Sequence, residues 1–142
     1  MTSTTSIPDD RELTAKERRL VEWLLDHSSA ESNRYRSQLG DARVAARCSC
    51  GCASVDFAIG GVMPKRGGPM SILSDYEWID SHGRIFGVFV FARCDLLAGL
   101  EVWSQDGMAI ANYLPDVTNL RPIGSTDTGE PSNAPESRSR AF

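Results

Sequence analysis

Residues 85–92 constrain the fold more than any other part of the chain, because every one of them is apolar or glycine. Successive side chains of a strand point to opposite faces of its sheet, so Phe86 and Val88 face one way while Gly87 and Phe89 face the other. A strand that is apolar on both faces belongs inside a sheet that is covered on both sides. An exposed strand of this kind is prone to aggregate.

The pattern before this segment predicts helices that cover one of the two faces. Thr14 and Glu17 are typical of a capping box at the start of a leucine-rich helix, and a second short helix is expected over about residues 29–39, stopped by Gly40. The expected strands span residues 43–47, 54–59, 71–79, 84–93 and 96–104. The sequence therefore predicts an α+β fold, with an N-terminal helix pair packed on one face of a roughly five-stranded antiparallel sheet. The chain's own loops, a second subunit or another protein must cover the other face.

Polar segments at both ends bound the expected domain. Residues 1–10 are mostly Thr, Ser and Asp, and residues 124–142 contain only three apolar side chains, too few to offset the entropy of ordering them. We therefore predict disordered tails over residues 1–10 and 124–142, and a single α+β domain over residues 11–123. The N-terminus lacks the basic start and apolar stretch of a secretory signal. No apolar run approaches the roughly 20 residues of a membrane-spanning helix, so we expect a cytoplasmic protein without membrane contact.

The feature that folding explains least is a cysteine cluster, Cys48-Ser-Cys-Gly-Cys52. Thiolates are good zinc ligands, and a structural zinc site needs four donors in a tetrahedron. Alternate residues of an extended strand point to opposite faces, so the three thiols converge only in a tight turn, which Gly51 permits. A strained and therefore labile disulfide within the cluster is another interpretation.

The sequence favours the simplest interpretation of these cysteines, which is a set of reduced, partly buried thiols in a hairpin bend with no cofactor. The alternative is a small zinc- or thiol-dependent domain centred on Cys48, Cys50 and Cys52. In that case Cys94 or His82 would supply the fourth zinc ligand.

Groups suited to catalysis are scarce in the chain, which has two histidines. His27 ends the first helix, where an imidazole interacts with free backbone carbonyls. His82 lies in a turn beside Asp80, and the glycine pairs lack the Lys-Ser/Thr of a phosphate-binding loop. We therefore predict no enzyme activity and no catalytic residues.

Acidic side chains gather in the second half of the domain. The whole chain has a net charge of −4, which argues against nucleic acid as a partner, and residues 71–116 carry seven acidic and two basic side chains, a balance of −5. An acidic sheet region with aromatic residues has the side-chain types of a binding surface for a cationic protein. The candidate partner-binding residues are Tyr76, Glu77, Trp78, Asp80, Glu101, Trp103 and Asp106. A solvated sheet face, with the aromatic residues in the core, would give the same pattern.

Four segments, in this order along the chain, resemble a small bacterial family without an established activity. They are Leu13-Thr-Ala-Lys-Glu17, Tyr35-Arg-Ser-Gln-Leu39, Arg47-Cys-Ser-Cys-Gly-Cys-Ala-Ser-Val55 and Leu100-Glu-Val102. The resemblance covers about residues 11–123, and its specific motif is Cys-x-Cys-Gly-Cys-x-Ser. Some members of the family lie near polymorphic-toxin loci, which implies an immunity-like role. We therefore predict a non-enzymatic protein-binding domain that caps a basic toxin domain, with a homodimer as the other possible assembly.

Overall fold

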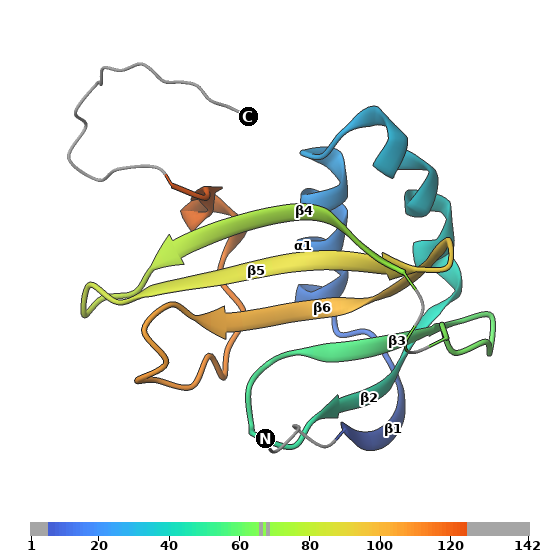
Figure 1. Ribbon diagram of the computed structural model, residues 1–142, viewed down its shortest axis with the longest axis horizontal. Coiled ribbons are helices and arrows are strands. Elements are labelled where there is room, and N and C mark those ends of the chain that lie inside the picture. The colour runs from blue at the N-terminus through green and yellow to red at the C-terminus, as the bar shows by residue number, and fades with distance from the viewer. Residues whose placement is uncertain (1–5, 66, 68, 125–142) are drawn as a thin grey trace.

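The computed structural model describes residues 6–65, 67 and 69–124, which form an antiparallel sheet with helices on one side (Figure 1). The strands in these residues follow the order β1-β2-β3-β6-β5-β4-β7 across one seven-stranded sheet. Their bounds are β1 Ser6–Glu12, β2 Ala42–Cys48, β3 Val55–Ile59, β4 Met70–Ile79, β5 Ile85–Arg93, β6 Leu96–Ser104 and β7 Arg121–Pro122. The helices are α1 Ala15–Asp26 and the 3₁₀ helices η1 Ala30–Asp41 and η2 Val117–Asn119. The α+β class and the antiparallel sheet are as predicted.

The sheet is larger than the five predicted strands because each end of the domain adds one. The first five residues of β1, Ser6 to Asp10, lie in the segment predicted to be a disordered tail, and the strand pairs with β2 through a register shift between Pro8 and Arg11. Its polar, proline-containing sequence has no strand pattern of its own, so pairing with a neighbour determines its structure. Strand β7 pairs with β4 on the opposite side. Apart from Gly124, the predicted C-terminal tail lies outside the described residues.

Helix α1 starts at the predicted capping box. The amide of Glu17 donates to the Thr14 hydroxyl at 3.0 Å, and the Glu17 carboxylate accepts from the Thr14 amide at 2.8 Å. The second helix differs from the prediction, since η1 is a 3₁₀ helix that continues past Gly40 to Asp41. Its N-cap residue Ser29 makes no side-chain capping bond, and its polar sequence gives an α-helix little local stabilisation.

The main core lies between the sheet and the helices. Side chains of α1 and of one face of β5 are fully or almost fully buried there, namely Leu20, Val21, Leu24, Leu25, Phe86, Val88 and Val90. Helix α1 contacts β4 and β5, while η1 contacts β6. No helix in the described part of the chain is long and apolar enough to cross a membrane.

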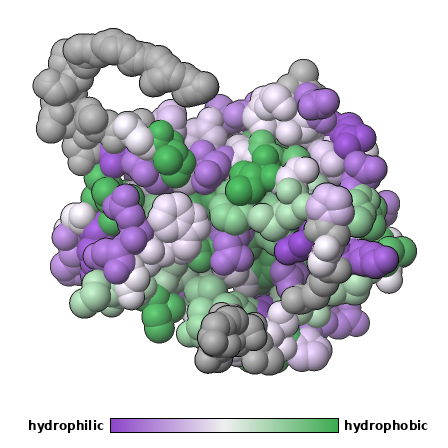
Figure 2. Space-filling view, viewed as in Figure 1, coloured by the Kyte–Doolittle hydropathy of each residue, from purple (hydrophilic) through white to green (hydrophobic). Residues whose placement is uncertain are grey.

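The face of the sheet away from α1, here called the outer face, is only partly covered. Figure 1 shows α1 behind the strands and this face toward the viewer. On β5, Phe91 is 6% exposed, but Phe89 is only half-buried. The prediction that β5 is covered on both faces is therefore right for the helix side and only partly right for the outer face. Figure 2 shows apolar and polar residues mixed across this surface.

Candidate functional site

The three clustered cysteines lie where the chain turns from β2 into β3. Cys48 is the last residue of β2, and the turn that follows contains Gly51 with a φ of 92°. Glycine adopts this left-handed conformation without a Cβ clash. The amide of Gly51 donates to the Cys48 carbonyl at 3.4 Å, and the amide of Cys52 donates to the Cys50 sulfur at 3.4 Å. The alternation of an extended strand is thereby broken, as convergence of the thiols requires.

The turn brings the three thiols together near the surface. All three Sγ atoms lie within 4.8 Å of one another, and the Sγ atoms of Cys48 and Cys50 are 3.0 Å apart. Burial, and then the hydrogen bond with Cys50, raise the pKa of Cys48 to about 12. The same hydrogen bond lowers the pKa of Cys50. Cys50 is exposed and its two neighbours in the cluster are half-buried, so ligands can reach the cluster from solvent.

Neither of the two residues suggested as a fourth zinc ligand belongs to this group. Cys94 is exposed in the turn before β6, whereas the cluster lies beside the other end of that strand. His82 lies in the turn between β4 and β5, where its amide donates to the Asp80 carboxylate at 2.8 Å. Within the described residues, no histidine or carboxylate joins the three cysteines as a potential metal-ligand group.

A seam where β3 and β6 separate adjoins the cysteine cluster. The described register between the two strands pairs Val55 with Leu100 and Asp56 with Gly99. Beyond these two pairs, the backbone of β6 bonds to a side chain of the other strand, the buried hydroxyl of Ser54, which lies one residue before β3. It accepts from the Val102 amide at 2.8 Å and donates to the Val102 carbonyl at 3.2 Å. The second half of β6 is therefore free to border cavities.

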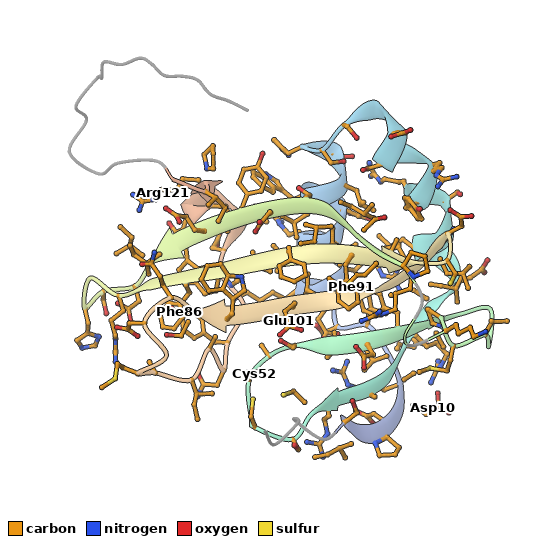
Figure 3. The ribbon with its side chains drawn as sticks, in the orientation of Figure 1. Asp10, Cys52, Phe86, Phe91, Glu101 and Arg121 are labelled. Carbon is orange, nitrogen blue, oxygen red and sulfur yellow. The ribbon has the colours of Figure 1, made fainter. Side chains whose placement is uncertain are left out.

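Two shallow cavities flank β6 at this seam. One, of about 240 Å³, is lined by all three clustered cysteines, by the end of β6 and by the segment after it, which comprise Cys48, Cys50, Cys52, Glu101, Val102, Trp103, Ser104, Gly107, Ala109, Ile110 and Ala111. The other, of about 220 Å³, lies on the outer face and is lined by Ser6, Arg47, Cys48, Ser54, Val55, Asp56, Phe91, Arg93 and Glu101. Cys48 and Glu101 line both cavities. In Figure 3, Phe91 and Glu101 lie on the outer face, with Cys52 in the loop below them.

The setting of the Glu101 carboxyl on this surface raises its pKa. Burial raises its pKa first and the nearby Asp56 carboxylate raises it further, while the Ser54 hydroxyl lowers it. Asp75 behaves similarly, because burial and then Glu77 raise its pKa. Both groups lie on the outer face, opposite Phe89 in the strand register. Of the two residues, Glu101 is half-buried, whereas Asp75 is exposed.

The structure separates the predicted partner-binding residues into three places. Tyr76 and Trp78 face the core side, where the Trp78 indole, 2% exposed, donates to the Tyr113 hydroxyl at 3.0 Å. Asp80 and Asp106 lie in turns and accept bonds from backbone amides. Glu77, Glu101 and Trp103 share the outer face.

The candidate set from the sequence left out further residues of the outer face, although the alternation of residues 85–92 had already placed Phe89 and Phe91 on the side away from Phe86. Strand register adds Asp56, Ile72, Asp75, Phe89 and Phe91 to the three just named. Alternation within β4 could have found Asp75, which is two residues before Glu77. The short pairing of β3 with β6 has no signal in the sequence, and Asp56 was therefore missed.

The comparisons with known proteins add no relative. No family model, no curated protein and no solved structure matches the chain. The resemblance to the bacterial family with the Cys-x-Cys-Gly-Cys-x-Ser motif therefore stays a prediction.

Proposed function

We propose that the protein binds a zinc ion through the thiolates of Cys48, Cys50 and Cys52. The observation that carries this proposal is the convergence of the three Sγ atoms to within 4.8 Å of one another. The sequence favoured thiols without a metal because an extended segment would hold them apart. The turn at Gly51 removes that objection. Soft thiolates select zinc and other soft ions over magnesium or calcium.

The spacing of the sulfurs suits a zinc ion. Tetrahedral zinc with bonds of about 2.3 Å holds its sulfur ligands about 3.8 Å apart. The 3.0 Å contact between Cys48 and Cys50 and the 4.8 Å limit for the group lie on either side of that value. Small side-chain rotations at the surface are sufficient to equalise the distances. The ion would displace the thiol protons, including the proton that Cys48 and Cys50 share as a hydrogen bond.

The test is metal analysis of protein purified under reducing conditions without added metal, followed by titration with zinc. We expect one zinc ion per chain, lost in Cys50→Ser and retained in Cys94→Ser. The second variant removes an exposed thiol outside the cluster and serves as the matched control. Zinc absent from the wild type and not taken up on titration would reject the proposal. Equal zinc uptake by the wild type and Cys50→Ser would reject it as well.

A second candidate function is association with a basic protein, as expected of an immunity-like protein, for which no catalytic residues are needed. The observation that favours it is the outer face, where the half-buried Phe89 lies between the carboxylates of Asp75 and Glu101. Ile72, 51% exposed, extends the apolar part of this surface. Burial raises the pKa of both carboxyls first, and repulsion from a neighbouring carboxylate (Glu77 for Asp75, Asp56 for Glu101) raises it further. A cationic partner would offset that repulsion, whereas a second copy of this acidic face would increase it. A cytoplasmic location is part of this proposal.

The test begins with the genes that neighbour the gene for this chain. A basic toxin domain encoded there would be titrated with this protein by calorimetry. We expect the affinity to fall as salt is added, because the attraction is between charged surfaces. Glu101→Lys is expected to weaken binding, while Glu12→Lys, an exposed site on β1, leaves it almost unchanged. Binding that is insensitive both to salt and to Glu101→Lys would reject the outer face as the interface.

A further inference from the structure

We propose that the zinc ion at this centre keeps its fourth coordination position open and that the position takes a neutral imidazole-type ligand with an apolar body. This inference rests on the proposed zinc site. It concerns what the site binds in addition to the metal.

The number of protein ligands leaves a position vacant. The described residues bring together three thiols, and no histidine or carboxylate joins them. Structural zinc sites are closed by four protein ligands, whereas sites with three keep the fourth position for water or another ligand. A zinc ion bound to Cys48, Cys50 and Cys52 belongs to the second kind.

All three cysteines line the same cavity of about 240 Å³, so a fourth ligand of the ion would have room there. The rest of the lining is mainly apolar and includes Trp103 and Ile110, while the side chain of Val102 is buried in the core. Ile110 is 58% exposed and therefore has surface left to cover. A ligand that bonds the metal at one end can place an apolar group against this lining.

The charge of the centre selects a neutral donor. Three thiolates and a divalent ion together carry a single negative charge, and the carboxyl of Glu101 lines the same cavity. An anionic ligand would add to this negative charge, whereas imidazole is neutral and suits zinc. Burying roughly 60 Å² of an attached phenyl ring is enough for about a tenfold gain in affinity.

The experiment uses the full chain loaded with cobalt, which reports its ligands through visible absorption. Thiolate-to-cobalt charge-transfer bands establish that the metal is bound by the cysteines. Imidazole, 1-benzylimidazole and acetate are then titrated separately. We expect imidazole to change the ligand-field bands at one equivalent bound, 1-benzylimidazole to bind about tenfold more tightly, and acetate to have no effect.

Two surface variants of matched residue type test the apolar lining. Ile110→Ser is expected to lower the affinity for 1-benzylimidazole and to leave that for imidazole unchanged. Ile72→Ser, an exposed isoleucine of β4 outside this cavity, is expected to change neither. Equal affinity of the wild type for imidazole and 1-benzylimidazole would show that the apolar lining does not contact the ligand. Equal changes in 1-benzylimidazole affinity in Ile110→Ser and Ile72→Ser would show the same.

The outcomes separate this inference from the proposed function. Absence of charge-transfer bands would reject the zinc site itself. If the charge-transfer bands are present but the ligand-field bands do not change when imidazole is added, the metal site stands and the open fourth position is rejected. If imidazole leaves the ligand-field bands unchanged but these bands differ between the wild type and Glu101→Gln, then Glu101 is the fourth ligand. This result would also overturn the inference. A peptide with one histidine between two leucines is titrated in the same way. Tighter binding of this peptide than of 1-benzylimidazole would indicate a protein side chain as the source of the ligand, and weaker binding would indicate a small molecule.

Discussion

The indole of Trp103 on β6 packs directly against Gly87 on β5, its neighbour in the strand register. A Cβ atom at position 87 would overlap the six-membered ring of the indole. Gly87 is thus required by packing, and its backbone does not adopt a positive φ. The pair covers part of the outer face that the helices leave open, and Trp103 also lines the cavity beside the cysteine cluster.

Gly87→Ala is therefore expected to displace Trp103 and to lower the free energy of unfolding by about 1–3 kcal/mol, the usual cost of overpacking. Urea unfolding measures the loss, and tryptophan fluorescence reports the displacement. Gly40→Ala is the control, because nothing lies within 4 Å of a Cβ at that position. A loss no greater than that of the control would contradict the observed contact.

Glu17→Gln tests the junction between β1 and α1. The buried Glu17 carboxylate accepts two bonds from the Arg11 guanidinium, both 2.9 Å long, besides the bond that caps α1. Burial raises the pKa of Glu17, but Arg11 and the Thr14 amide outweigh it, so the net pKa lies below the usual 4.5. Charge-assisted bonds of this kind contribute about 1.5–3 kcal/mol, and we expect a loss of this size at pH 7.

The pH dependence of the Glu17 contribution follows from the lowered pKa. The stabilisation is complete above pH 4.5, the unfolded value, and is lost as the pH falls through the lower pKa of the folded state. The difference in unfolding free energy between wild type and Glu17→Gln should therefore shrink on acidification below that pH. A difference that stays constant down to the acid unfolding of both proteins would be evidence against the ion pair.

Glu101→Gln is expected to act in the opposite direction and to stabilise the protein at neutral pH. Burial and Asp56 raise the pKa of Glu101, so its ionisation costs stability as the pH rises through the folded value. Glutamine removes that cost and leaves the shape of the side chain almost unchanged. Thermal unfolding from pH 4 to pH 8 measures the effect, with Glu12→Gln as the exposed control. Parallel profiles for the wild type and Glu101→Gln would refute the expectation.

Ser54→Ala tests how the seam between β3 and β6 is closed. The variant removes the hydroxyl that serves both the amide and the carbonyl of Val102. Buried backbone groups without partners cost about 1–3 kcal/mol, and we expect a loss in this range on urea unfolding. Ser81→Ala, in an exposed turn, is the control. Faster hydrogen exchange at the Val102 amide would accompany the loss, and unchanged exchange would contradict the role of Ser54.

The elements that could be predicted from the sequence are those that depend on neighbours along the chain. The capping box of Thr14 and Glu17 depends on residues three apart, and the apolar pattern of residues 85–92 identifies a central strand without knowledge of its partners. Strand β1 was missed because its conformation depends on pairing with β2, about 35 residues away. The outer face was only partly predicted for the same reason, since its members come from four strands.

The cysteine cluster lies between these two cases. From the sequence it can be predicted that the thiols converge only if the chain turns tightly at Gly51. Local propensity does not determine whether that turn forms. Packing of the loop decides it, because the amide of Ala53 donates to the Ala111 carbonyl at 2.8 Å and so holds the loop against a segment far along the chain. Cys94 could not be separated from the cluster without the course of β6.

The seam between β3 and β6 also determines how the sheet can deform. Within the described residues it joins two halves, one made of β1, β2 and β3 and the other of β6, β5, β4 and β7, through far fewer paired residues than link β4 with β5. Helix α1 follows β1 in the chain but packs across β4 and β5, and η1 contacts both β3 and β6, so the helical layer spans the two halves. A sheet built in this way is stiff within each half and compliant along one line. Because both cavities border that line, a change in the spacing of β3 and β6 would alter the walls of both cavities together.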